Sequence, residues 1–269
     1  MVVRLPLLEF CKPVNIAPTC PSSTPRFVTF AFTNTDRWDY KLLVKGFKLM
    51  YSSLALAHGC PPLIYVYTNS GDVVKALGPT FKTTFGSAVN VLAIEKTVES
   101  IDMHGFSDPW IRLSRHKLDI IQDHLFGDKP ERLIWIDIDT FVFEDLTELY
   151  NSGKSWVIGN QHGKRTGLEI LGTPIPPAFD AQGDLWMIKD RASIDEILHL
   201  EESIIDPNNR PTYDLQGYFS VLLSRASKHF RLVTDIVDRN FGFQCSNYEH
   251  PMPGESYKTE VCQEASGTA

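Results

Sequence analysis

The sequence predicts an α/β protein whose core is a mostly parallel sheet with helices on both faces. First, apolar stretches of strand length alternate with stretches of helical periodicity along the first half of the chain. Second, Asp137 and Asp139 follow the fourth apolar stretch, LIWI, at the carboxyl end of a strand, where open α/β sheets bind their ligands. Third, 43% of the 269 residues are hydrophobic and 22% are charged, which is ordinary for a globular protein with a sizeable core.

The expected strands and helices follow from the period of the apolar residues. The strands are short and strongly apolar, and they span residues 26–32, 63–69, 88–94, 133–137, 155–160 and 185–190. The helices repeat apolar residues at helical spacing, and they span residues 39–59, 109–127, 193–205 and 215–230. Gly59 suits a helix C-cap, Pro109 suits a first helical turn, and residues 69–71 (Asn-Ser-Gly) predict a turn after the second strand.

No linker divides the chain into independent domains. Residues 1–25 are rich in proline and lack periodicity, so they predict an irregular N-terminal arm. Residues 26–258 hold the alternating pattern and are expected to form one domain, followed by a C-terminal tail at 259–269.

Charge and composition exclude two classes of partner. The formal net charge is -7 and no Lys/Arg-rich block occurs, which argues against nucleic acid, because phosphate backbones require a basic face. No segment is long and apolar enough to span a membrane, and the N-terminal residues lack a signal-peptide pattern.

The five cysteines are scattered without a regular framework, which predicts reduced thiols. We therefore expect a cytoplasmic protein, and a homodimer is left open.

The two aspartates predict a cation site. Carboxylates one residue apart present hard oxygen ligands to one divalent ion when the chain turns just after the strand. Such ligands suit Mn²⁺ or Mg²⁺, which share their coordination with substrate phosphates. The simpler alternative is that Asp137 and Asp139 end the strand and face water. The apolar runs on both sides, LIWI and TFVF, favour the cation site.

Two other enzyme classes agree less well with the sequence. Haloacid-dehalogenase-type phosphatases carry D-x-D-x-T at the end of their first strand. Here Thr140 follows Asp139 directly, Phe141 stands where that Thr is needed, and at least three strands come before. Sugar-1-phosphate nucleotidyltransferases need a glycine-rich, basic loop after the first strand, and the stretch TNTDRWDYK is neither.

The stretch LIWIDIDTFVFEDLTELY, at 133–150, resembles the D-x-D region of glycosyltransferase family 8, which includes glycogenin and bacterial lipopolysaccharide galactosyltransferases. The resemblance implies a GT-A fold, a Rossmann-like catalytic domain at 26–258. It implies retaining transfer of glucose or galactose from UDP-glucose or UDP-galactose to a hydroxyl of a glycan, glycoprotein or polyol. In such an enzyme Asp137 and Asp139 hold Mn²⁺ or Mg²⁺.

A second match follows the first expected strand, in FAFTNTDRWDYKLL. The resemblance implies that four residues bind the UDP part of the donor: Thr33, Asn34, Asp36 and Trp38. Trp38 takes the place of a Tyr that stacks on uracil, and either ring supplies a π face. On the helix before the acidic strand, Lys117 matches a basic residue that reaches the donor.

The matches near the reacting sugar are partial. FDAQGDLWMIKD and YDLQGYFSVLL stand where the family has F-N-x-G and D-Q-G. The resemblance implies that Gln216 faces the sugar, with three neighbouring carboxylates, Asp180, Asp184 and Asp214. Because these matches are only partial, the identities of the transferred sugar and of the acceptor stay open. A second interpretation also stays open, in which the protein is a degenerate GT-A domain that binds nucleotide sugars or glycans as a scaffold.

The last match is HPMPGESYK, whose spacing is longer than in the family. The resemblance implies that His250 completes the metal ligands and that Gly254 and Lys258 contact the diphosphate. A polar segment without apolar periodicity, carrying these groups, is expected to close over bound donor.

Overall fold

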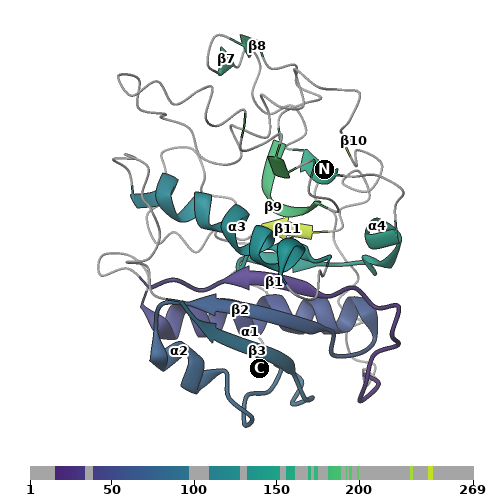
Figure 1. Ribbon diagram of the computed structural model, residues 1–269. Coiled ribbons are helices and arrows are strands. Elements are labelled where there is room, and N and C mark those ends of the chain that lie inside the picture. The colour runs from purple at the N-terminus through teal and green to yellow at the C-terminus, as the bar shows by residue number, and fades with distance from the viewer. Residues whose placement is uncertain are drawn as a thin grey trace, which may run out of the picture.

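The structure, a computed structural model, confirms the predicted α/β class (Figure 1). It describes residues 16–33, 39–96, 109–127, 132–151, 156–160, 169–170, 173–174, 181–188, 192, 194–195, 199, 231–232 and 242–244. The expected helix at 215–230 lies outside these residues, whereas described residues 192, 194–195 and 199 of the expected helix at 193–205 and its edge are helical.

One sheet of seven strands forms the centre of the molecule, in the order β10-β6-β9-β4-β1-β2-β3. The strands are β1 (Phe27–Phe30), β2 (Leu63–Thr68), β3 (Asn90–Glu95), β4 (Ile134–Ile136), β6 (Trp156–Asn160), β9 (Ala181–Ile188) and β10 (Arg231–Leu232). The pairs β1–β2, β2–β3, β1–β4 and β6–β10 are parallel. Strand β9 alone among them runs antiparallel, between β4 and β6, so the prediction of a mostly parallel sheet is confirmed.

Two small antiparallel pairs accompany the main sheet. Strand β5 (Thr140–Val142) pairs with β11 (Gly242–Gln244), directly after the acidic segment. Strand β7 (Glu169–Ile170) pairs with β8 (Thr173–Pro174). Neither pair was predicted, because strands of two or three residues carry too few residues to show a period.

The helices that accompany the sheet include α1 (Tyr40–His58), α2 (Gly71–Ala76), α3 (Pro109–Phe126) and α4 (Thr147–Asn151). Helix α1 begins where the Asp39 side chain accepts the Leu42 N–H at 2.8 Å. It ends at Gly59, whose φ of 64° confirms the predicted C-cap, since glycine adopts the left-handed conformation without a steric cost. Helix α2 corrects the prediction of a simple turn at 69–71.

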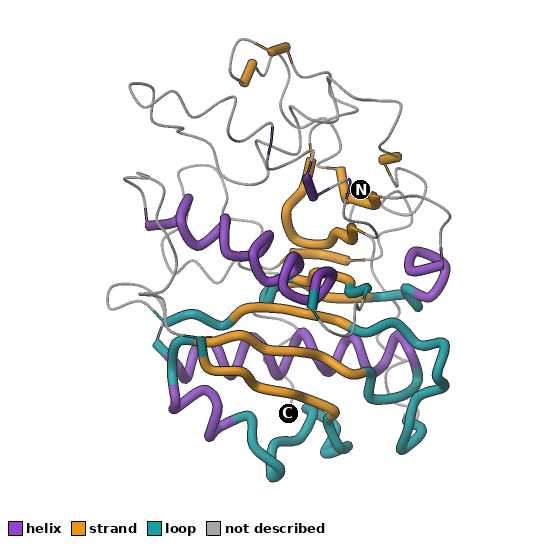
Figure 2. Tube along the Cα trace, viewed as in Figure 1, coloured by secondary structure: helices purple, strands orange, loops and turns teal. Residues whose placement is uncertain are grey.

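The two faces of the sheet carry separate cores. Helices α1 and α2 cover one face and α3 covers the other (Figure 2). Because side chains alternate along a strand, Ile136 of β4 packs on the α1 side and Trp135 packs on the α3 side. Both are fully buried. The face that each residue near the site uses is therefore set by its place in the strand.

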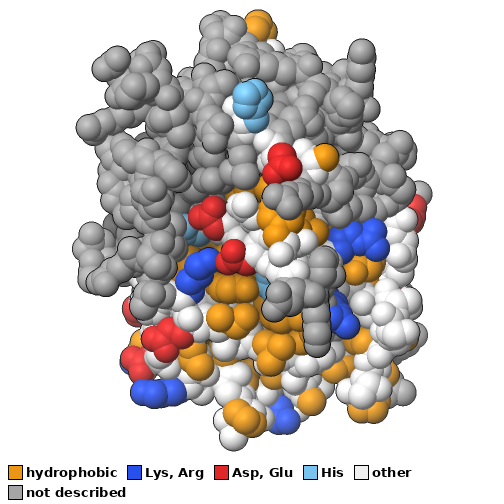
Figure 3. All heavy atoms as spheres, in the orientation of Figure 1, with side chains coloured by type: hydrophobic (Ala, Val, Ile, Leu, Met, Phe, Trp, Pro, Cys, Tyr) orange, Lys and Arg blue, Asp and Glu red, His pale blue; other side chains and the backbone are white. Residues whose placement is uncertain are grey.

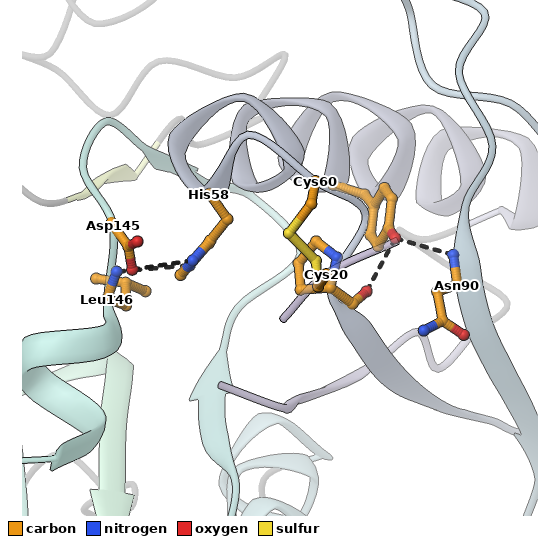
Figure 4. Close-up of a disulfide and its surroundings, with 8 residues drawn as sticks. Cys20, His58, Cys60, Asn90, Asp145 and Leu146 are labelled. Atoms are coloured by element: carbon orange, nitrogen blue, oxygen red, sulfur yellow. Dashed lines mark hydrogen bonds and ion pairs between the residues drawn. A yellow bond between two sulfur atoms is a disulfide. The ribbon is translucent and has the colours of Figure 1, made fainter. Parts of the chain in front are cut away.

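The cysteine prediction was wrong for two of the five cysteines. Cys20 and Cys60 form a disulfide, with their Cα atoms 5.1 Å apart (Figure 4). The bond joins the segment before β1 to the end of α1, where Ala17 also donates its N–H to Gly59 O at 2.8 Å. Disulfides are rare in the cytosol, so the cysteines no longer support a cytoplasmic location. None of the described helices has the length and apolarity to cross a membrane.

Candidate active site

The acidic segment lies at the carboxyl end of β4, as predicted. The chain turns at once after the strand: Thr140 donates its N–H to the carbonyl oxygen of Asp137 at 3.0 Å. Asp137 precedes this turn and Asp139, which is half-buried, lies within it. Strands β1, β2 and β4 are parallel, so their carboxyl ends meet at this edge of the sheet.

The carboxylate of Asp137 is held by two side chains. Lys117 Nζ of α3 lies 2.7 Å from both Oδ1 and Oδ2. Trp135 Nε1 donates to Oδ1 at 2.6 Å. The Lys117 and Asp137 side chains are 7% and 16% exposed, so the ion pair is largely removed from water. A pair in this setting depends on both partners, because either charge alone would be buried and uncompensated.

An irregularity in β9 brings more polar groups to the same point. The pairing of β6 with β9 shifts between Ile158 and Gly159, which marks a bulge around residues 183–185 of β9. In that stretch Asp184 accepts the Asp137 N–H through its backbone oxygen at 2.8 Å, and Lys117 Nζ donates to Gly183 O at 3.3 Å. Asp184 is 6% exposed. Bulges bend a strand and re-aim its side chains, and they are common beside active sites.

Thr33 lies at the carboxyl end of β1, on the same edge, and is bound to Asn69 after β2. Its N–H and hydroxyl both donate to Asn69 Oδ1, at 2.8 and 3.0 Å, and its carbonyl accepts from Asn69 Nδ2 at 2.9 Å. These three bonds fix the backbone that leads into residue 34. The sequence predicts only a turn at Asn69 and not this contact. The available signal was the position of Asn69 directly after an expected strand, where parallel sheets bind their ligands.

A cluster of aromatic and charged residues borders this edge on the α3 side. Tyr67 of β2 and His124 of α3 lie 2.9 Å apart, from hydroxyl to Nε2. Burial raises the pKa of Tyr67 to about 12, with the Asp123 carboxylate and Tyr65 adding to the shift. Tyr67 therefore stays protonated near neutral pH and joins β2 to α3. In Figure 3, acidic and basic side chains lie together over α3, above the hydrophobic side chains that β2 and β3 present.

Five of the predicted site residues are described, and four of them gather around β4 and its neighbours. Lys117, Asp137 and Asp184 are joined by direct contacts, and Asp139 lies two residues beyond Asp137. Thr33 lies at the carboxyl end of β1, the strand next to β4. The other predicted residues lie outside the described residues: Asn34, Asp36, Trp38, Asp180, Asp214, Gln216, His250, Gly254 and Lys258.

The oxygen atoms that could bind a metal at this site are of the kind that a hard divalent cation prefers. Asp137 and Asp139 supply carboxylate oxygens, which Mg²⁺ and Mn²⁺ prefer. Oδ2 of Asp137 accepts one bond from Lys117, and an oxygen of a carboxylate has a second acceptor position. The described residues contain no group of three His, Cys, Asp or Glu side chains arranged for a metal. The third predicted ligand, His250, is not among them.

Solved structures share this fold at low sequence identity. No protein-family model matches the chain, and no curated protein sequence matches it. Mouse xyloside xylosyltransferase 1 in its apo form is similar at 13% identity, over 78% of this chain and 84% of that one, with a TM-score of 0.51. An active-site mutant of the galactosyltransferase LgtC is similar at 14% identity, over 89% and 95% of the chains, with a TM-score of 0.53. The predicted GT-A glycosyltransferase fold is thereby confirmed.

Proposed function

We propose that this protein is a metal-dependent retaining glycosyltransferase that moves a hexose from a UDP-sugar to a hydroxyl of a glycan, glycoprotein or polyol. One observation carries the proposal: Asp137, Lys117 and Asp184 converge at the carboxyl end of β4, with Asp139 in the following turn. In parallel α/β sheets this edge is where ligands bind. Two of the solved structures that share the fold are, by name, a xylosyltransferase and a galactosyltransferase.

In this proposal Asp137 and Asp139 hold Mn²⁺ or Mg²⁺. The ion would supply positive charge to the diphosphate that leaves when the sugar–phosphate bond breaks. Lys117 holds the Asp137 carboxylate in place rather than acting as a distant surface charge, because its Nζ is bonded to both oxygens. Charge that is already in place before bond breaking stabilises the transition state without a reorganisation cost.

The remaining predicted residues keep their proposed roles. The segment after β1, with Asn34, Asp36 and Trp38, is assigned to the uridine, and Thr33 fixes its starting point through Asn69. Four polar residues are assigned to the sugar: Gln216, Asp180, Asp184 and Asp214. Gln216 stabilises positive charge on the sugar through its carbonyl oxygen, since a carboxamide is a weak nucleophile.

The C-terminal segment is assigned to closing the site. His250 is proposed as the third metal ligand, and Gly254 and Lys258 as contacts to the diphosphate. A closed site excludes water, which matters because hydrolysis of the donor competes with transfer.

A binding module without catalysis is the second candidate. The observation that favours it is the Lys117 ammonium, which neutralises the carboxylate that a metal would share. Such a module would bind UDP or glycans and release no product. The two candidates differ in turnover, and one assay separates them.

The test is release of UDP from a panel of UDP-sugars, with Mn²⁺, with Mg²⁺ and with a chelator. The panel contains UDP-glucose, UDP-galactose and a xylosyl donor, the last because a xylosyltransferase shares the fold. The Asp137→Asn, Asp139→Asn double variant measures contaminating activity. We expect metal-dependent release from one donor. No release above the double variant from any donor, with UDP still bound, would favour the binding module.

A further inference from the structure

Trp135 donates a hydrogen bond to the acidic site from inside the protein core. The side chain is fully buried on β4, and its Nε1 lies 2.6 Å from Oδ1 of Asp137. Residues two apart on a strand project from the same face, so Trp135 and Asp137 both face α3. Any large apolar ring could fill this core position. The indole is distinct because its N–H reaches the carboxylate.

Ring packing fixes the direction of that N–H. The Trp135 ring stacks on Trp186 of β9, with centroids 5.7 Å apart and planes at 14°. The ring of Phe30 on β1 also lies against the Trp135 ring, with their centroids 5.5 Å apart. Close-packed rings cannot rotate without displacing one another. The indole therefore serves as a fixed donor aimed at Asp137.

Lys117 completes the arrangement from α3. Its Nζ bonds both oxygens of Asp137 and Gly183 O, which uses the three N–H groups of an ammonium. The same Nζ lies 5.5 Å from the Phe30 ring and 5.6 Å from the Trp135 ring, within range of a cation–π contact. The ammonium is thus confined between two rings, a carboxylate and a carbonyl.

The two carboxylate oxygens of Asp137 differ in their hydrogen-bond partners. Oδ1 accepts from both Trp135 and Lys117, which fills the two acceptor positions of a carboxylate oxygen. Within the described part of the chain, Oδ2 accepts from Lys117 alone. The side chain is therefore held in one orientation, with one oxygen committed to the protein and the other able to accept a further partner.

We propose that Trp135 is a positioning residue for a divalent cation: together with Lys117 it holds Asp137 so that Oδ2 is the oxygen offered to the ion. This inference rests on the proposed metal site. Groups that hydrogen-bond a metal ligand fix its orientation, and their removal commonly weakens metal affinity by about 10–100-fold. The distinction from a merely structural tryptophan is that the N–H, and not the ring volume, matters.

The first test examines the hydrogen bond without any metal or substrate. The five tryptophans give five indole N–H resonances in a protein with ¹⁵N-labelled tryptophan, and Trp135→Phe identifies one by its loss. We expect the Trp135 resonance to move upfield in Asp137→Ala, because the carboxylate acceptor is gone. A Trp135 resonance that stays in place in Asp137→Ala, with the protein folded, overturns the proposal whatever the enzyme activity.

The second test measures binding of MnCl₂ alone, by electron paramagnetic resonance of the free ion. Trp135→Phe is compared with Trp186→Phe, which removes an equally buried indole from the same stack but not the N–H that binds Asp137. We expect Mn²⁺ affinity to fall about 10-fold or more in Trp135→Phe and to stay near the wild-type value in Trp186→Phe. Mn²⁺ should also broaden the Trp135 indole resonance, and Asp139→Ala should remove that effect.

The two tests separate this inference from the proposed function. Equal loss of Mn²⁺ affinity in the two tryptophan variants, or no loss in either, overturns the positioning role even when UDP-sugar turnover is found. A wild-type protein that binds no Mn²⁺ overturns it as well. A selective loss in Trp135→Phe supports it even when no UDP-sugar tested is a donor.

Discussion

The ammonium of Lys117 lies 2.7 Å from both carboxylate oxygens of Asp137, and neither group has ready access to water. A second cation, Lys96, pairs with Asp123 at 3.0 Å near the C-terminal end of α3, but there the side chains of Lys96 and Asp123 are 23% and 62% exposed. The same chemical pair thus occurs twice on one helix, once buried and once at the surface. We expect burial to determine how much each ion pair contributes to the free energy of unfolding.

We expect Lys117→Met to lower the free energy of unfolding by about 3 kcal/mol, because Asp137 is left as a buried and uncompensated charge. Lys96→Met is the matched control and should cost about 1 kcal/mol or less, since an exposed pair contributes little. Urea denaturation of both variants measures the difference. Equal losses would show that the buried pair is not special.

The metal ligands make a prediction about turnover. Asp137→Asn and Asp139→Asn should each lower UDP release by about 100-fold or more, the scale for losing a group that stabilises developing charge. Asparagine rather than alanine is chosen at Asp137, because it can still accept from Trp135 and Lys117. The control is Asp145→Asn, whose side chain is 54% exposed and bonded to α1 and α4. Near-normal, metal-dependent turnover in either site variant would refute the assignment.

The main elements of the fold could be predicted because their apolar periods are long enough to read. Helices α1 and α3 appeared within a residue of their expected ends. Helix α2 was missed because its six residues cannot display a helical period and its start, Ser70-Gly71, favours a turn. The antiparallel direction of β9 depends on a long connection through residues 161–180, and no local pattern encodes it.

The candidate site, like the fold, could be predicted from the sequence only in part. The position of Asp137 and Asp139 after a buried strand was visible in the sequence. The partner of Lys117 was not, since the two residues are 20 apart and only the packing of α3 on the sheet joins them. Trp135 could have been noticed, because two-residue alternation places it on the same face as Asp137. The disulfide was missed because cysteines 40 residues apart carry no spacing rule.

That disulfide gives a prediction about stability. Closing a loop between cysteines 40 residues apart restricts the unfolded chain, which in the chain-entropy account stabilises the fold by about 4 kcal/mol. A reducing agent should therefore lower the melting temperature of the wild-type protein. The Cys20→Ser, Cys60→Ser double variant should melt at the lower temperature and show no response to reductant. A wild-type melting temperature unchanged by full reduction would contradict the bond or its contribution.

His58 at the end of α1 predicts how stability changes with pH. Its side chain is 1% exposed, Nδ1 lies 3.0 Å from Asp145 Oδ1, and Nε2 accepts the Leu146 N–H at 3.5 Å (Figure 4). Burial lowers the pKa of His58 below its usual 6.5, and the Asp145 carboxylate opposes this in part. The neutral ring, with Nδ1 donating and Nε2 accepting, is therefore the form that the fold prefers.

The sign of the effect follows from which state takes up the proton first. As the pH falls below 6.5, His58 becomes protonated in the unfolded chain while it stays neutral in the folded protein. Proton uptake therefore stabilises the unfolded state relative to the folded one. We expect the wild-type protein to lose stability from above to below pH 6.5 relative to His58→Gln, which cannot titrate there. In Asp145→Asn the opposing charge is gone, the pKa of His58 falls further, and the loss should extend to lower pH. Thermal melts across this range measure both differences. A wild-type protein that gained stability relative to His58→Gln on acidification would mean that the folded state prefers the charged ring, with Asp145 outweighing burial.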